Sequence, residues 1–233
     1  LEIYVKNIIH NYYEFKKINE NKNVAAVVKS NAYGTGIKKI SNILINEGCN
    51  DFFVATLDEG IKLRKINKHI NIFILNGISK NEINIFIKFK LTPVINNIEQ
   101  FNLLIKNDRK ITIMLHYDTG INRLGLTFDE TLYINSKIQN SKIKLSYIIS
   151  HLVSAEKTKD IYNKKQLKKF LKLSRILNNN KFSLANSAGA FLKKDYHFNM
   201  IRAGISLYGG YGNKKIKNKI KYTIKLKAKI IQI

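Results

Sequence analysis

Short apolar, β-branched runs recur along the chain and alternate with longer stretches of three- to four-residue periodicity. The short runs are bounded by turn residues or charges, as expected for strands buried on both faces of a parallel sheet. We predict eight such strands, over Val24–Val28, Phe52–Ala55, Ile72–Leu75, Thr92–Ile95, Ile111–Tyr117, Leu145–Ser150, Phe182–Ala185 and Ile201–Leu207.

The stretches between these strands have the periodicity of amphipathic helices, since Ile37, Ile40, Ile43 and Leu44, for example, fall on one helical face. Helices are predicted over Ile8–Ile18, Ile37–Glu47, Leu57–Lys65, Lys80–Phe89, Ile98–Lys106, Phe128–Asn140 and Thr158–Asn179. Eight strands that alternate regularly with helices favour an α/β fold of the (β/α)8 TIM-barrel type. The alternative is an open, doubly wound sheet.

The last twenty residues have a different pattern. Lysines alternate with apolar residues there, most regularly over Tyr222–Ile230, and this period of two predicts a half-buried strand. A strand that follows a complete barrel needs a partner, because an unpaired edge promotes aggregation. We therefore expect residues 1–212 to form a barrel domain and residues 213–233 to begin a truncated, β-rich C-terminal domain. The alternative is a solvated basic tail.

Charge and composition change this picture little. The chain has 233 residues, of which 41 are Lys or Arg and 16 are Asp or Glu, so its formal net charge is +25. Such a charge can indicate nucleic-acid binding. The lysines are nevertheless scattered among many asparagines and isoleucines, without a zinc knuckle, a recognition-helix pattern or an aromatic RNP run. We expect no specific nucleic-acid partner, only salt-sensitive adhesion to polyanions.

A cytoplasmic location without a membrane partner is expected. No apolar run approaches the length that a bilayer requires, and the first residues lack the basic-then-apolar layout of a signal peptide. The lone Cys49 cannot form an intrachain disulfide, which fits a reducing compartment. We interpret Cys49 as a packed thiol, because no catalytic pattern surrounds it.

The most informative stretch begins where the first predicted strand ends, at Lys29. A turn of small residues that contains Gly34 and Gly36 follows directly. The C-terminal ends of barrel strands carry the reactive groups, so the amine of Lys29 would lie there and could attack an aldehyde. The hydroxyl of Tyr33, four residues later, could bind a phosphate. Alone, Lys29 would be one surface lysine among many, but this context favours a functional role.

Residues 28–36 (VKSNAYGTG) resemble the cofactor-lysine motif of alanine racemases, with Thr35 where the family commonly has histidine. Four further segments resemble family motifs in the family's order. They are residues 118–125 (DTGINRLG), 150–156 (SHLVSAE), 185–189 (ANSAG) and 201–209 (IRAGISLYG). The chain is thus similar to the pyridoxal-phosphate barrel domain of an alanine racemase.

The resemblance implies pyridoxal 5'-phosphate as the cofactor, bound covalently by Lys29, with its phosphate near Tyr33. It implies that Arg123 contacts the substrate carboxylate and that Arg202 faces the pyridine nitrogen, with His151 bonded to Arg202. An arginine does not readily give up a proton, so the ring nitrogen would stay unprotonated and simple proton return would be favoured over transamination. In full, the resemblance assigns cofactor binding to Lys29, Tyr33, His151, Asn186, Ser187, Arg202, Gly204 and Ile205, catalysis to Lys29 and Arg123, substrate binding to Arg123, and no metal site.

Two positions depart from the family pattern. His116 stands where many members have a lysine, carbamylated in some, that supports the arginine corresponding to Arg123. A histidine cannot be carbamylated in the same way, although it can form hydrogen bonds. Ser183 stands where some members have histidine.

The function implied is interconversion of L-alanine and D-alanine, which supplies D-alanine for peptidoglycan synthesis. A homodimer is implied as well, because in the family a tyrosine from the partner's β-domain is the second base. Two alternatives remain. One is a non-catalytic pyridoxal-phosphate homeostasis protein. The length of such a protein would fit 233 residues well, whereas its motifs would fit this sequence poorly. The other is a racemase of another small amino acid, such as serine.

Overall fold

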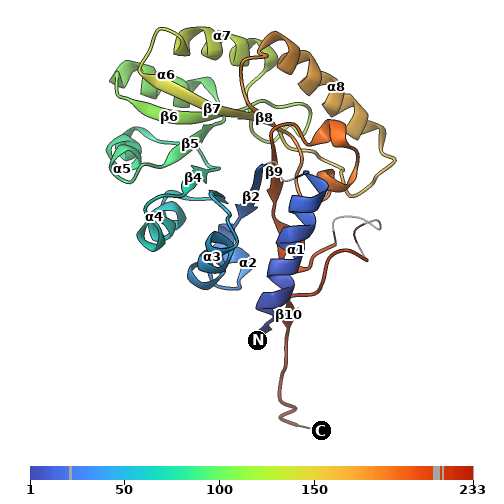
Figure 1. Ribbon diagram of the computed structural model, residues 1–233. Helices are drawn as coiled ribbons and strands as arrows, with labels where there is room; N and C mark the ends of the chain where they lie inside the picture. Colours follow the sequence, from blue (N-terminus) through green and yellow to red (C-terminus); the bar gives the residue numbers. More distant parts are fainter. Residues whose placement is uncertain (21–22, 212–215, 217, 233) are drawn as a thin grey trace.

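Eight parallel strands form the centre of the molecule in the computed structural model, which describes residues 1–20, 23–211, 216 and 218–232 (Figure 1). They are β2 (Asn23–Val27), β3 (Asp51–Val54), β4 (Asn71–Ile74), β5 (Thr92–Ile95), β6 (Ile111–His116), β7 (Ile143–Ile149), β8 (Phe182–Ser183) and β9 (Met200–Ala203). Their order in space is β8-β7-β6-β5-β4-β3-β2-β9, and each neighbouring pair is parallel.

The two strands at the ends of that order, β8 and β9, also lie side by side. The amide of Asn199 donates to the carbonyl of Phe182 at 2.9 Å, and the amide of Arg202 donates to the carbonyl of Ala185 at 3.0 Å. The sheet therefore nearly closes into a barrel. This confirms the predicted (β/α)8 architecture, and the open doubly wound sheet is wrong.

Helices surround the barrel (Figure 1). They are α1 (Val5–Ile18), α3 (Ile37–Asn46), α4 (Leu57–Ile66), α5 (Ile83–Lys88) with the preceding 3-10 turn η1 (Lys80–Glu82), α6 (Ile98–Asn107), α7 (Phe128–Ile138) and α8 (Ile161–Ile176). Each overlaps a predicted helix. Between β8 and β9 the chain forms two short 3-10 turns, η2 (Gly189–Phe191) and η3 (Lys194–Tyr196), in place of a longer helix.

The apolar core has two parts, as barrels require. Side chains inside the barrel form one cluster, made of Ala25, Phe53, Phe73, Val94, Met114, Ile149 and Met200. A larger cluster lies between the strands and the helices. Cys49 belongs to the larger cluster, and burial raises the pKa of its thiol to about 11, which agrees with a packed rather than a reactive thiol.

The last predicted barrel strand is shorter than the apolar run Ile201–Leu207 suggests. Strand β9 ends at Ala203, and a 3-10 turn, η4 (Ile205–Tyr208), follows. The amide of Leu207 donates to the carbonyl of Gly204 at 2.8 Å, which turns the chain away from the strand direction. The prediction was wrong beyond Ala203 because an apolar run alone does not distinguish a buried strand from a buried turn.

The chain's two ends meet beside α1. Strand β10 (Ile224–Lys225) pairs antiparallel with β1 (Glu2–Ile3), a strand that the pattern did not predict. Only these two residues of the predicted strand Tyr222–Ile230 are in a strand. The predicted boundary between residues 212 and 213 lies outside the described residues.

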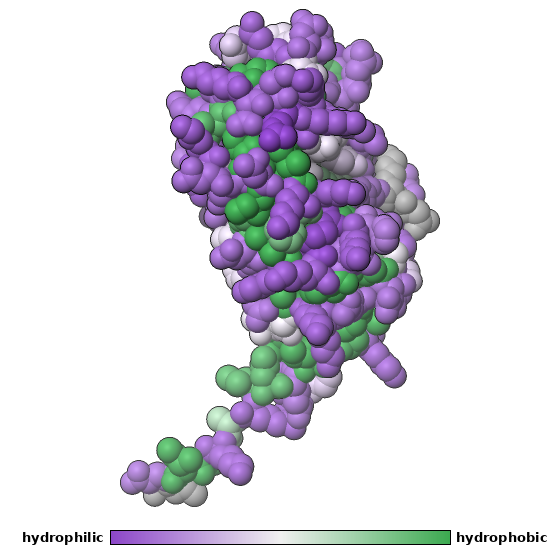
Figure 2. All heavy atoms as spheres, turned by 90° about the vertical axis from the view of Figure 1, so that its left-hand side faces the viewer, coloured by the Kyte–Doolittle hydropathy of each residue, from purple (hydrophilic) through white to green (hydrophobic). Residues whose placement is uncertain are grey.

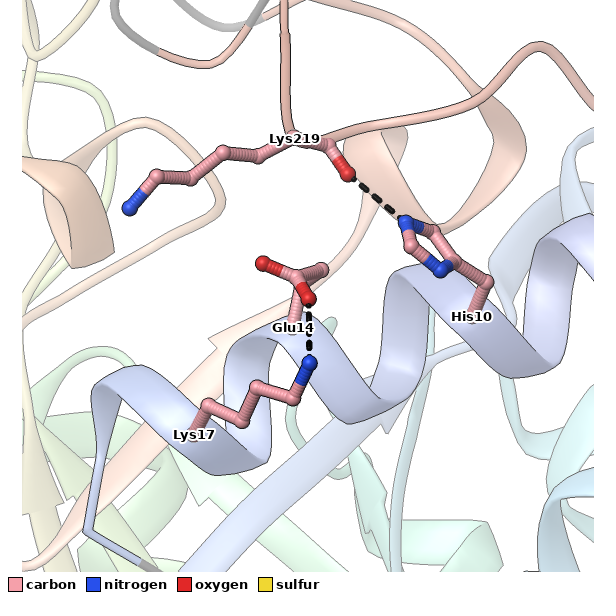
Figure 3. A network of polar contacts seen from close by, with 4 residues as sticks. All are labelled: His10, Glu14, Lys17 and Lys219. Carbon is pink, nitrogen blue, oxygen red and sulfur yellow. Dashed lines mark hydrogen bonds and ion pairs between the residues drawn. The ribbon is translucent and has the colours of Figure 1, made fainter.

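Side chains of α1 hold this C-terminal segment. The Nε2 atom of His10 lies 3.0 Å from the carbonyl oxygen of Lys219 (Figure 3). An ion pair within α1, between Lys17 and Glu14 at 2.9 Å, lies near this contact. Deeper in the molecule, Asn11 donates to the carbonyl groups of Leu207 and Lys221.

Long hydrophilic side chains cover most of the surface on the side of α3 to α5 (Figure 2). Hydrophobic atoms are prominent in the extended C-terminal segment, where Leu226, Ile230 and Ile231 are exposed. None of the described helices is both long enough and apolar enough to cross a membrane.

Candidate active site

A cavity of about 680 Å³ opens at the C-terminal ends of the barrel strands. Parallel barrels place their chemistry at this face, because the loops that follow the strands converge there. Every site residue predicted from the sequence lines this cavity: Lys29, Tyr33, Arg123, His151, Asn186, Ser187, Arg202, Gly204 and Ile205. Five different strand ends thus deliver the predicted groups to one place.

The half-buried Lys29 begins an unusual turn. Ser30, Asn31, Ala32 and Tyr33 all have φ between 52° and 55°, so α2 (Lys29–Tyr33) contains a left-handed turn made of residues other than glycine. Such a conformation costs about 1–2 kcal/mol per residue and must be held by its surroundings.

The left-handed turn is held mainly through Asn31. Its amide donates to a carboxylate oxygen of Glu59 at 3.3 Å, and its side-chain oxygen accepts from the amide of Ile37 at 2.9 Å. Its carbonyl accepts from the amide of Gly36 at 2.9 Å. Contacts with α3 and α4 therefore fix the backbone from which Lys29 enters the cavity.

Tyr33 lies against Tyr208, with ring centroids 4.7 Å apart, and the hydroxyl of Tyr208 donates to the carbonyl of Val27 at 3.1 Å. Burial raises the pKa of Tyr33, so its phenol is neutral and able to donate at physiological pH. A Cβ atom at Gly204 would lie 2.9 Å from the Tyr33 hydroxyl oxygen. Glycine at this position keeps the space beside that hydroxyl open.

Ser187 lies next to this space. Its hydroxyl oxygen accepts from the amides of Gly204, at 2.8 Å, and Ser206, at 3.3 Å. Because both bonds use the oxygen as an acceptor, the hydroxyl hydrogen remains available to a ligand. Asn186 has a supporting role, since its side-chain oxygen accepts from the amide of Gly189 at 2.8 Å.

Arg202 is buried in β9 and anchored by backbone carbonyl groups. One terminal nitrogen donates to the carbonyl and the hydroxyl of Ser183, at 2.8 and 2.6 Å, and the other donates to the carbonyl of Ser150. Burial lowers the pKa of Arg202 to about 10, which still leaves the guanidinium charged at neutral pH. Ser183, a departure from the family pattern, is thus a direct partner of this arginine.

The expected bond between His151 and Arg202 is not formed, since among the described residues Arg202 donates to oxygens of Ser150, Ser183 and Leu184 instead. The His151 ring is nevertheless close to Arg202. Burial, together with the charge of Arg202, lowers the pKa of His151 to about 3. The imidazole is therefore neutral in the cavity wall.

Arg123 is exposed at the rim of the cavity, in a loop that Asp118 organises. One carboxylate oxygen of Asp118 accepts from the amides of Gly120 and Ile121, both at 2.9 Å. Asx-type turns of this kind fix a loop without regular secondary structure. The loop therefore presents the Arg123 guanidinium to the opening.

The model of the family "Alanine racemase, N-terminal domain" matches residues 3–212. The chain belongs to this family. It is 40% identical to an alanine racemase of Rickettsia africae over 239 aligned positions, which cover the whole chain and 66% of that protein. It is 42% identical to one of Rickettsia bellii over 92% of the chain and 54% of that protein. The chain thus spans just under two thirds of the first of these relatives and about half of the second.

Solved structures agree with the family assignment. The crystal structure of alanine racemase from Bartonella henselae, described as having covalently bound pyridoxal phosphate, superposes with a TM-score of 0.88. Its sequence identity is 33%, over 95% of this chain and 66% of that one. Biosynthetic alanine racemase from Pseudomonas aeruginosa also gives a TM-score of 0.88, at 27% identity.

For this alanine racemase N-terminal domain, the sequence motifs missed three polar residues that line the cavity, Asn76, Asn96 and Tyr211. Asn76 and Asn96 each follow closely on the end of a predicted strand. That position alone could have marked them as candidates, because polar residues at the C-terminal ends of barrel strands face the site.

Proposed function

We propose that the chain is the cofactor-binding barrel of an alanine racemase, which interconverts L-alanine and D-alanine with pyridoxal 5'-phosphate. The observation that carries the proposal is the convergence on one cavity of a lysine amine, two guanidinium groups, a neutral phenol and a serine hydroxyl. Family membership supports the same conclusion.

The cavity residues match the chemical groups of pyridoxal phosphate one by one. An amine such as that of Lys29 binds the aldehyde, and Arg202 offers a buried cation to the ring nitrogen. Tyr33 and Ser187 flank the hollow that Gly204 leaves open, and their hydroxyl donors suit a phosphate. Ile205 and Asn186 complete the wall on this side. The residues therefore fit the cofactor.

Bound here, pyridoxal phosphate would withdraw electrons from the α-carbon of an amino acid. The amine of Lys29 removes and returns the α-proton on one face. The guanidinium of Arg202 keeps its proton at neutral pH, so it cannot protonate the ring nitrogen fully. Arg123, at the rim, attracts the carboxylate of alanine. The neutral His151 adds no charge that would compete with these cations.

We extend the proposal to the whole protein. Residues 1–212 form the barrel domain, residues 213–233 begin a β-rich domain, and the protein is a cytoplasmic homodimer whose partner subunit supplies the second base. The exposed apolar residues of the C-terminal segment, such as Leu226 and Ile231, support a further packing partner for that segment. The D-alanine produced would supply peptidoglycan synthesis.

Borohydride reduction tests the cofactor assignment. The protein is incubated with pyridoxal phosphate and reduced, and the labelled peptide is mapped. We expect the label at Lys29 and its loss in Lys29→Ala, while Lys38→Ala, which changes an exposed lysine of α3, keeps it. A label on a different lysine would contradict the proposal.

Exchange of the α-hydrogen in deuterated water tests the reaction separately. We expect deuterium to enter alanine, and to enter serine more slowly. Cofactor labelling at Lys29 without any exchange would favour the non-catalytic homeostasis protein instead. Faster exchange of serine would favour a serine racemase.

A further inference from the structure

Helix α8 carries a buried amide behind the cavity wall, that of Gln166. Its side chain lies on the face of the helix that also buries Phe170 and Leu173 in the apolar core. An amide is tolerated in such a place when its polar atoms are hydrogen-bonded. Both hydrogens of the Gln166 side-chain nitrogen and its side-chain oxygen have partners, and all of these partners belong to loops at the cavity end of the barrel.

Gln166 binds the loop between β7 and α8, residues 150–160, at two points. Its side-chain nitrogen donates to the carbonyl of His151 at 2.8 Å, and its side-chain oxygen accepts from the amide of Val153 at 2.9 Å. A backbone amide only donates and a carbonyl only accepts, so these two bonds fix the orientation of the Gln166 amide. The bonded segment belongs to the cavity wall, because Ser150 and His151 line the cavity.

The second hydrogen of the same nitrogen reaches the loop between β6 and α7, residues 117–127. It is donated to the hydroxyl oxygen of Thr119 at 3.0 Å, and this hydroxyl lies 2.7 Å from that of Ser150. Thr119 and Ser150 are both buried. One amide thus joins two cavity loops through a chain of uncharged hydrogen bonds, and a buried network with its members bonded holds them in one arrangement.

The chain of hydrogen bonds ends at Arg202. The carbonyl of Ser150 accepts from a terminal nitrogen of the Arg202 guanidinium. The ring of His151, the next residue, is close enough to Arg202 that this charge adds to burial in lowering the histidine pKa. Because Arg202 donates to oxygens of other residues, the bonds between the His151 backbone and Gln166 determine where the ring lies.

We propose that Gln166 is a positioning residue, which ties the loops after β6 and β7 together behind the cavity and holds the segment 150–151 beside Arg202. Gln166 itself is not among the residues that line the cavity, so it acts through this segment. The consequence for the cofactor rests on the proposed function, in which Arg202 faces the ring nitrogen. A guanidinium whose acceptor is displaced would bind the cofactor less tightly.

Asn163, one turn earlier on α8, provides a matched control. It is also buried, and its side-chain nitrogen donates to the carbonyls of Ser154 and Lys157 in the same loop, at 3.2 and 3.0 Å. Neither of these two residues lines the cavity. Gln166→Met and Asn163→Leu each replace a buried amide by an apolar side chain of similar size, so we expect them to destabilise the fold to a similar extent.

Histidine NMR of the cofactor-free protein separates positioning from packing. The pKa of His151 is lowered to about 3 by burial and then by the charges of Arg202, Arg123, His116 and Lys29. In Gln166→Met the ring should leave this environment, and we expect its proton affinity to rise about tenfold or more as the pKa moves toward the ordinary value of about 6.5. Asn163→Leu should leave the titration of His151 as it is. An unchanged His151 in Gln166→Met, or an equal change in both variants, would overturn the inference.

Variants of Thr119 test the link between the two loops. Absorbance titration with pyridoxal phosphate measures the Kd, which we expect to rise about tenfold in Gln166→Met and about threefold in Thr119→Val. Thr119→Ser keeps the hydroxyl and should recover the affinity. In the double variant, Thr119→Val should add little to Gln166→Met, because the bond between the two side chains is already lost.

The two tests fail in different ways. Full additivity of Gln166→Met and Thr119→Val, or equal losses of affinity in Thr119→Val and Thr119→Ser, would overturn the inference. Failure of the wild type to bind pyridoxal phosphate would instead contradict only the proposed function, since the titration of His151 is measured without the cofactor.

Discussion

Among the residues that the structure describes, Arg202 is a cation held by backbone carbonyl groups and a hydroxyl, without a carboxylate partner. Its donors reach carbonyl oxygens where β7 and β8 end, and such charge-assisted bonds are among the strongest in proteins. The arrangement leaves the positive charge uncompensated and therefore available to an anionic or electron-rich ligand. It also makes the side chain important for stability, because its partners are buried too.

Removal of this side chain should destabilise the fold as well as the site. In Arg202→Met, the buried carbonyl group of Ser150 loses its bond from Arg202, and the carbonyl group of Ser183 keeps only the bond from the amide of Ser150. We expect the free energy of unfolding to fall by about 3 kcal/mol. Urea denaturation monitors the change. The control Arg175→Met, on the exposed side of α8, should change stability by about 0.5 kcal/mol or less. Equal effects of the two changes would contradict this account of Arg202.

Acid should weaken the fold through two cavity histidines. The pKa values of His116 and His151 are lowered to about 4 and about 3, whereas a histidine of the unfolded chain binds a proton near pH 6.5. Between these values the unfolded chain binds more protons, so their contribution to stability is present above pH 6.5 and is lost as the pH falls. Each histidine contributes a slope of up to about 1.4 kcal/mol per pH unit.

Urea denaturation at a series of pH values between 6 and 4 measures this slope. We expect His151→Gln to reduce it by about 1.4 kcal/mol per unit, as one such group should. His69→Gln, a change at an exposed histidine, should leave the slope as it is. Parallel pH profiles for the wild type and His151→Gln would refute the assignment.

Sequence motifs located residues that line one cavity, but not the hydrogen-bond partners of those residues. All nine predicted residues line one cavity, because each lies near the C-terminal end of a barrel strand or in the segment that follows it. The acceptors of Arg202 are mostly backbone carbonyl groups. Every residue type has such a group, so a residue pattern cannot identify these acceptors. For the same reason the prediction of a bond between His151 and Arg202 was wrong. Its place is taken by Ser183, which the motif comparison marked only as a departure.

At the scale of elements, Glu59 connects a helix start to the cofactor lysine. It completes a capping box with Thr56 at the N-terminus of α4, and its other carboxylate oxygen accepts from Asn31 in the left-handed turn. The N-terminus of α7 has the same box, formed by Thr127 and Glu130, without a contact to the site. Glu130 is therefore a matched control for Glu59.

Glu59→Ala and Glu130→Ala should each lower the free energy of unfolding by about 1 kcal/mol, since each removes half of a capping box. Only Glu59→Ala should also weaken the left-handed turn. We expect it to raise the Kd of pyridoxal phosphate about fivefold, corresponding to one hydrogen bond of about 1 kcal/mol. Absorbance titration of the cofactor measures this difference. A similar rise in Glu130→Ala would show that general destabilisation explains the effect.

Helices and strands were predictable because the burial of one face imposes a periodic pattern of apolar residues. The exceptions are segments whose conformation is determined by tertiary contacts. Strand β5 begins and ends where the apolar run does, and α8 lies within its predicted range. The left-handed turn was not predictable, because Ser30–Tyr33 contains no glycine and is held by distant residues. The alternation over Tyr222–Ile230 yields only a two-residue strand, because β1 is equally short.

The whole molecule carries a large positive charge, and its site is positive too. With a net charge of +25, the protein attracts anions from every side, and Lys29, Arg123 and Arg202 continue this potential into the cavity. A phosphate-bearing cofactor and the carboxylate of an amino acid are both drawn by such a field. We therefore expect the scattered surface lysines to assist the binding of both anions.

The two chain ends are joined through Asn11, which is fully buried on α1. Its side chain donates to the carbonyls of Leu207 and Lys221, at 3.2 and 2.9 Å, and accepts from the amide of Lys221 at 2.8 Å. One amide thus ties the first helix to η4, next to the cavity, and to the segment that leads to β10. Loss of the Asn11 side chain should therefore affect both η4 and the segment that leads to β10.

Asn11→Ala should therefore lower the free energy of unfolding by about 3 kcal/mol, because it leaves three backbone groups without partners. The amide of Lys221 should exchange with solvent faster than global unfolding explains, whereas the amides of β3 should follow global unfolding alone. Asn7→Ala removes a single bond, to the carbonyl of Tyr222, and should cost about 1 kcal/mol. Hydrogen exchange with mass spectrometry measures each segment. Unchanged protection of Lys221 in Asn11→Ala would show that the strand pair β1–β10 holds the C-terminal segment without α1.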